Sequence, residues 1–251
     1  LHRADRGALS GPPFCIRQPP DTATSSCGGL LARQVDRDVL RHALNALMHL
    51  ATVSDAHGRL VRMLPALPLR ELCEPERNDN WDGVVELQHA ICRLIELLAK
   101  SPDASLCGVV AAPLEQLLRC RKAPTVQATA ARAARALGLH GGPATGALLR
   151  ASVPAAALAL VSSDETSNAA REESVRTLRT LADANDEWAA ALATPAALGA
   201  LLDCALGGPA NSRPKGAEPG LKGARVQALW AIGSALGVAG GAAELCAPAR
   251  L

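Results

Sequence analysis

The chain of 251 residues contains 49% hydrophobic and 20% charged residues, a balance that excludes disorder over most of its length. Only 2% of the residues are aromatic, so the apolar volume comes from small and aliphatic side chains, which suit packed helices rather than a β-sandwich. The net charge of +2 is too small to indicate a nucleic-acid or membrane partner.

Residues 1–37 contain Gly-Pro-Pro and Pro-Pro sequences without a sustained period, and we expect an irregular or disordered leader there. Apolar residues at helical spacing begin close to residue 38. Uninterrupted apolar runs of about 18 residues do not occur, so the sequence does not predict a membrane-spanning helix.

From residue 38 to residue 251 we expect about five helical repeats. Five segments superimpose without gaps, namely 39–50, 86–97, 126–137, 170–181 and 224–235. Each has a small residue at its fifth position and apolar residues four and seven positions later, as on one face of a helix that a neighbour approaches closely. The small residues are Ala43, Ala90, Ala130, Ser174 and Ala228. In the first segment the apolar residue seven positions after the small residue is Leu50.

The small residues recur at intervals of 47, 40, 44 and 54 residues, close to the length of two- and three-helix solenoid repeats. A proline follows the small residue in each of the five repeats, and we expect each proline to begin a new helix after a bend. These prolines are Pro65, Pro113, Pro154, Pro195 and Pro248. The last interval is the longest because residues 207–223, rich in Gly and Pro, are predicted to form an inserted loop.

This pattern resembles the armadillo family. The stretch LLRASVPAAALALVSS (148–163) is similar to the family's helix-bend-helix portion, and segments 126–137 and 224–235 are similar to its longer third helix. The resemblance implies an all-α fold, a right-handed superhelical solenoid whose third helices line an inner groove. The related HEAT repeat is the alternative fold.

Side chains at the fourth, seventh and eleventh positions of each segment lie away from the buried stripe. Third helices stacked side by side would present them as one concave strip, which is our candidate partner-binding groove. The candidates are His42, Asn45, His49, His89, Glu96, Thr129, Arg132, Glu173, Arg176, Thr180, Gln227, Trp230 and Ser234. An ordinary solvated helix face is the alternative interpretation. Arg132 and Arg176 favour an acidic partner segment by charge complementarity.

The sequence contains none of the common catalytic motifs, namely a Gly-rich phosphate loop, a GxSxG elbow or HExxH, so we expect no enzyme and no cofactor. The eight cysteines show no CxxC and no zinc-like spacing. We interpret them as free thiols of a reducing compartment, which predicts a cytoplasmic location and leaves the nucleus or an organelle open.

The stretch LRTLADANDEW (178–188), followed by ALWAIGSAL (228–236), is similar to the armadillo-type nucleotide-exchange factors of seventy-kilodalton heat-shock chaperones. That resemblance implies a co-chaperone that binds the chaperone's nucleotide-binding domain. The sequence therefore predicts a non-catalytic protein-interaction scaffold or adaptor. The alternatives are such an exchange factor and a HEAT-like structural subunit of a larger assembly.

The fifth repeat reaches Pro248 only three residues before Leu251. Terminal repeats need a polar cap, so we expect the apolar stripe of Leu229, Ile232 and Leu236 to be covered by further chain, a partner or a second copy.

Overall fold

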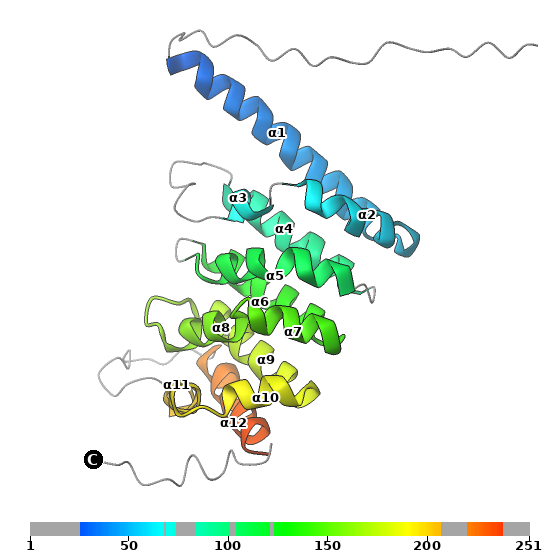
Figure 1. Ribbon diagram of the computed structural model, residues 1–251. Coiled ribbons are helices and arrows are strands. Elements are labelled where there is room, and N and C mark those ends of the chain that lie inside the picture. Colours follow the sequence, from blue (N-terminus) through cyan, green and yellow to red (C-terminus); the bar gives the residue numbers. More distant parts are fainter. Residues whose placement is uncertain are drawn as a thin grey trace, which may run out of the picture. The chain divides into compact units, whose positions relative to one another are not determined.

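The computed structural model describes residues 26–67, 69–73, 84–100, 104–120, 123–206 and 220–237, and within these ranges the secondary structure is entirely helical. Contacts divide the chain into two compact units, residues 1–36 and 37–251. The first helices are α1 (Ser26–Leu50), η1 (Ser54–Ala56), α2 (His57–Met63), η2 (Leu64–Ala66), α3 (Leu69–Cys73) and α4 (Val84–Leu98). They are followed by α5 (Ala104–Leu118), α6 (Pro124–Gly138), α7 (Gly142–Arg150), α8 (Val153–Ser162), α9 (Asn168–Ala184), α10 (Asp186–Leu192), α11 (Pro195–Leu206) and α12 (Gly220–Gly237) (Figure 1).

The five aligned segments lie within α1, α4, α6, α9 and α12. Two predicted boundaries are wrong. Residues 26–37 of the expected leader belong to α1, and residues 220–223 of the expected loop belong to α12. Helical periodicity cannot locate such ends, because a helix continues through polar or Gly-rich residues as long as its backbone bonds are made. The rest of both predictions, and Pro248, lie outside the described residues.

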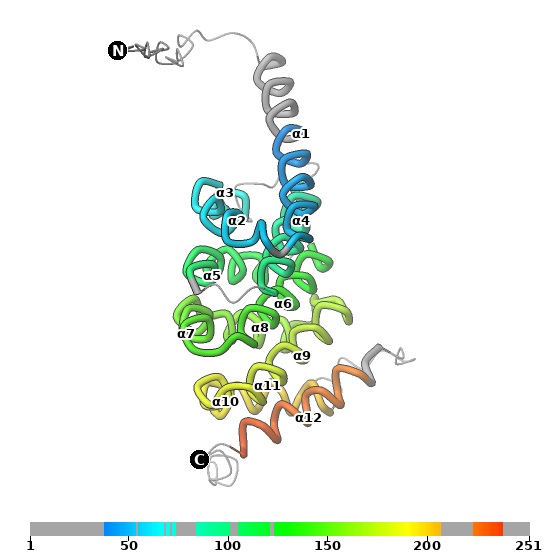
Figure 2. The backbone as a smooth tube through the Cα atoms, turned by 90° about the vertical axis from the view of Figure 1, so that its right-hand side faces the viewer, coloured from blue at the N-terminus to red at the C-terminus, as the bar shows by residue number. Residues whose placement is uncertain are grey.

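The helices of the second unit form two layers. In one layer α4 contacts α6, α6 contacts α9 and α9 contacts α12. Figure 2 shows these four helices following one another from α4 down to α12. The other layer contains α3, α5, α7, α8, α10 and α11, and here α5 contacts α7 and α8, while α8 contacts α11. A single continuous core of mostly Leu, Val, Ile and Ala side chains fills the space between the layers.

Sharp bends occur in the second layer. The axes of α7 and α8 differ by 61°, and those of α10 and α11 by 79°. Pro154 lies in the first turn of α8 and Pro195 begins α11, where the missing amide hydrogen costs nothing. Pro65 lies in the first turn of η2.

The expected bend at Pro113 is wrong, because this buried proline lies inside α5. The ring removes one backbone hydrogen bond, but Leu106, Val110 and Leu114 are buried on the same helix. Their burial favours one continuous helix over two short ones.

The predicted small residues Ala90, Ala130, Ser174 and Ala228 are all buried. At Gly138 an added Cβ would lie 2.5 Å from Leu181 Cδ2, so α6 and α9 approach closely. Thr177 also donates a hydrogen bond of 2.9 Å from α9 to the Ala131 carbonyl of α6.

In α1 the alignment is wrong. Ala43 is exposed and Leu50 is 51% exposed, while Leu44 is fully buried. Apolar spacing gives the stripe of a helix only to within about one position, and the neighbouring helices determine which side is covered.

Some helix starts have clear local causes. The Ser167 side chain accepts a hydrogen bond from the Ala170 amide at the start of α9. Ser152, between α7 and α8, has φ 60° and ψ 27°, a left-handed conformation that a glycine adopts more easily. This bend therefore carries backbone strain.

We expect Ser152→Gly to raise the free energy of unfolding by about 0.5–1 kcal/mol, because relief of the strain exceeds the added entropy of the unfolded chain. Urea denaturation followed by circular dichroism measures the change. Ser162→Gly is the matched control, because Ser162 is the exposed last residue of α8 and has an ordinary helical backbone, and we expect it to lower stability by up to about 0.5 kcal/mol. Equal losses in both variants would contradict the strain at Ser152.

Within the described residues no single helix is long and apolar enough to span a membrane. The bent pairs α7–α8 and α10–α11 are each long and apolar enough when their two helices are taken together.

Candidate protein-interaction surface

The helices α4, α6, α9 and α12 carry a set of partly or fully exposed side chains, mostly polar, that we call the third-helix face. Its members are His89, Arg93, Glu96, Arg132, Arg135, Glu172, Glu173, Arg176, Arg179, Thr180, Asp183, Gln227, Trp230 and Ser234. Hydrogen bonds and ion pairs join α6, α9 and α12 across this surface.

The link between α6 and α9 is a charged network. Arg135 lies 3.3 Å from a carboxylate oxygen of Glu173. Arg176 binds Glu173 at 2.7 Å and Glu172 at 2.8 Å. Two carboxylates therefore balance the charge of Arg176, which weakens the expectation that this residue attracts an acidic segment.

The link between α9 and α12 is built around Arg179. Its guanidinium donates to the Gln227 side chain at 2.9 Å and pairs with Asp183 at 3.3 Å. The same group lies 4.8 Å from the ring centre of Trp230, which is 58% exposed. Ser234 donates a hydrogen bond to Asp183. An open hollow of about 400 Å³ lies at this junction, lined by Asp183, Leu229, Trp230, Gly233 and Ser234.

One predicted member of the groove is wrong. Thr129 is only 2% exposed, and its hydroxyl donates to the Thr125 carbonyl at 2.9 Å. Helix α6 is covered by α4 and α9 on its flanks and by α5 behind, so only a narrow strip that includes Arg132 and Arg135 remains accessible.

The remaining candidates fall into two groups. His42, Asn45 and His49 are exposed on α1, and no described hydrogen bond or ion pair joins them to the third-helix face. His89 and Glu96 are half-buried on α4, where Glu96 pairs with Arg93 at 2.6 Å. The structure therefore brings together the candidates on α9 and α12, and through Arg135 it connects them to α6.

The predicted groove did not include five members of this face, namely Arg93, Arg135, Glu172, Arg179 and Asp183. A signal for three of these residues was present, because Glu172, Arg176, Arg179 and Asp183 have the i, i+4, i+7, i+11 spacing of one helix face and carry charges of both signs. Arg135 has no such signal, since its partner Glu173 lies on another helix.

The stretch that resembles chaperone exchange factors has local structural roles here. The Asn185 side chain accepts hydrogen bonds from the Glu187 and Trp188 amides at 2.9 and 3.2 Å, and so caps α10. Its amide also donates to the Thr145 hydroxyl of α7 at 3.2 Å. Trp188 is fully buried. Helix capping and core packing thus account for Asn185 and Trp188 of this stretch.

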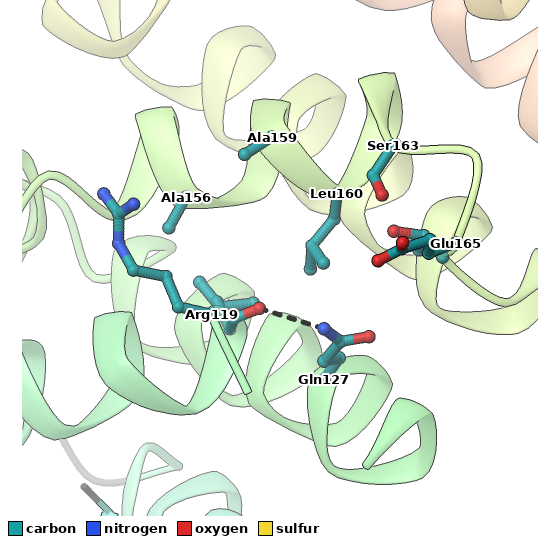
Figure 3. Close-up of a pocket in the computed structure, with 9 residues that line it drawn as sticks. Arg119, Gln127, Ala156, Ala159, Leu160, Ser163 and Glu165 are labelled. Carbon is teal, nitrogen blue, oxygen red and sulfur yellow. Dashed lines mark hydrogen bonds between the residues drawn. The ribbon is translucent and has the colours of Figure 1, made fainter. Parts of the chain in front are cut away.

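A second hollow of about 250 Å³ lies between α8 and the junction of α5 with α6 (Figure 3). Leu160 points into it from α8, opposite Gln127, whose amide donates to the Leu118 carbonyl at 3.3 Å. Arg119 and Glu165 lie toward opposite ends of the hollow, and Arg119 pairs with Glu115. The predicted groove residues do not line this hollow.

The described cysteines are buried. Burial raises the pKa of Cys73 to about 12, and burial also raises the pKa of Cys92 and of Cys204. These thiols are therefore protonated at neutral pH and are poor nucleophiles. In the part of the chain that the structure describes, His, Cys, Asp and Glu side chains form no group of three or more that could hold a metal ion.

Comparisons with family models, with curated proteins and with solved structures found no match for this chain.

Proposed function

We propose that the protein is a non-catalytic scaffold or adaptor that binds a partner protein on the third-helix face of a right-handed, armadillo-type solenoid. The observation that carries the proposal is the linked surface of α6, α9 and α12, which ends in an exposed tryptophan. Polar side chains held by cross-helix bonds lose little entropy on binding, and a surface tryptophan is a frequent anchor of protein interfaces.

The bent pairs α7–α8 and α10–α11, each followed by a long helix, support armadillo-type units. The unbent α5 is instead what a two-helix HEAT repeat would contain. This helix favours the second candidate, a HEAT-like structural subunit of a larger assembly. In that case as well the protein acts by binding.

The proposal is tested by photo-crosslinking from two positions of the full chain. A benzoylphenylalanine replaces half-buried Thr180 on the third-helix face or exposed Arg150 at the end of α7. We expect a partner to crosslink from position 180 and not from position 150. Purified partner should then bind Trp230→Ala about 10 to 100 times more weakly, the usual loss for a tryptophan anchor.

Arg150→Ala is the matched control for this measurement and should leave the affinity unchanged. Crosslinks that arise only from position 150, or an unchanged affinity of Trp230→Ala, would place the functional surface elsewhere on the molecule.

A further inference from the structure

The third-helix face has an unbalanced charge at α6. Arg93, Arg135, Arg176 and Arg179 each pair with a carboxylate. Arg132 pairs with no carboxylate in the described part of the chain. It reaches only the Thr129 hydroxyl at 3.5 Å, and its Nε is buried without an acceptor among the described residues. A partly desolvated guanidinium without a counter-charge favours a carboxylate from a partner.

The same face has an apolar hollow at α12. Trp230 and Leu229 are both 58% exposed, and an added Cβ at Gly233 would meet nothing within 4 Å. Arg179 covers the Trp230 ring and is itself oriented by Gln227. A bulky apolar side chain fits this site, whereas the carboxylate of Asp183 disfavours an acidic one.

The two sites are separated by two helix spacings. Packed helices lie about 8–10 Å apart, so α6 and α12 are roughly 16–20 Å apart across α9. Trp230 stacks on Arg179, which lies about one helical turn beyond Arg176 on α9, so Trp230 is displaced by about 5 Å along the helix axis, at right angles to the spacing between helices. The path from Arg132 to the hollow is therefore roughly 20 Å long, the length of about six residues of extended chain.

We infer that the third-helix face binds an extended segment of a partner protein in which an Asp or Glu contacts Arg132 and a bulky apolar residue, five or six positions away, fills the hollow beside Trp230. This inference rests on the proposed function and specifies the ligand of the same surface. Glu173, Thr180 and Gln227 lie on α9 and α12 and can bond the backbone of an extended segment. A helical segment satisfies its own backbone and would need about 13 residues for the same span.

The test is selection of random 16-residue peptides, displayed on phage, on the full chain. Peptides that also bind the double variant Arg132→Gln/Trp230→Ala are removed before each round of selection. We expect the selected peptides to share an acidic residue and a bulky apolar residue five or six positions apart. A fluorescein-labelled representative should bind Arg132→Gln about tenfold more weakly by fluorescence anisotropy. Arg150→Gln, which changes an exposed arginine on α7, should bind it normally.

A double-mutant cycle distinguishes a direct contact between Arg132 and the acidic residue of the peptide from a general effect of replacing Arg132. Replacing the acidic residue of the peptide by the corresponding amide should lower the affinity for the original protein by the same factor of about ten. The same replacement should not lower the affinity for Arg132→Gln any further. Circular dichroism melting of each variant shows whether it folds, and Arg132→Lys, which keeps the charge, should recover part of the affinity. Three outcomes overturn the inference. The acidic and apolar residues of the selected peptides lie about 13 positions apart, the affinity losses from the peptide and protein substitutions add up, or no peptide is enriched on the original protein over the double variant.

These outcomes are separable from failure of the proposed function. A partner that crosslinks from position 180 and depends on Trp230, but whose bound segment lacks the acidic residue, overturns this inference alone. Crosslinking only from position 150 overturns both.

Discussion

Replacing Trp188 by Ala is expected to lower the free energy of unfolding by about 3–5 kcal/mol, the range for deleting a buried aromatic side chain. Trp188 is fully buried on α10, which contacts α7, α8, α9 and α12. Its loss leaves a cavity where these helices meet, and close-packed neighbours relax only partly into such a space. Urea denaturation followed by circular dichroism measures the change.

Trp230→Ala is the matched control for this prediction. It removes the same side chain from a position that is 58% exposed, so we expect a loss below about 1 kcal/mol, mainly from the contact with Arg179. Similar losses in the two variants would show that α10 does not pack as described.

Ala130→Leu is expected to destabilise the protein by about 1–3 kcal/mol through overpacking. Ala130 is fully buried in α6, which contacts α4, α5 and α9, and the hydrogen bond from Thr177 of α9 to the carbonyl of the adjacent Ala131 holds α9 close to this position. Chemical denaturation monitored by circular dichroism gives the difference in unfolding free energy.

Ala43→Leu tests whether this cost depends on burial. Ala43 has the same position in the aligned segment of α1, but it is exposed, so we expect a change within about 0.5 kcal/mol. A stable Ala130→Leu variant, or an Ala43→Leu variant that is equally damaged, would contradict the burial pattern of these helices.

The sequence by itself predicted where the long helices lie and most of their buried small residues. Apolar residues at i, i+4 and i+7 produce one apolar face in any helix, so Ala90, Ala130 and Ala228 could be identified before any neighbour was known. The bends at Pro154 and Pro195 were equally predictable, because the restriction that proline places on the backbone is local.

Tertiary structure decided which flank of each helix is covered. Thr129 and Arg132 are three positions apart on α6, yet one is buried and the other half-exposed, because α4, α5 and α9 cover different amounts of the surface around them. The bend expected at Pro113 failed for a related reason, since burial of α5 as one helix outweighs one lost backbone bond.

The candidate site depended on tertiary structure most of all. From sequence, Arg132 and Arg176 are equivalent cations, whereas in the structure Glu172 and Glu173 pair with Arg176, and Arg132 has no carboxylate partner among the described residues. The stacking of Trp230 on Arg179 is likewise fixed by how far α12 is displaced along α9. Helical periodicity is a property of one segment, but ion pairing and register between helices are properties of two surfaces in contact, and only the packed structure determines them.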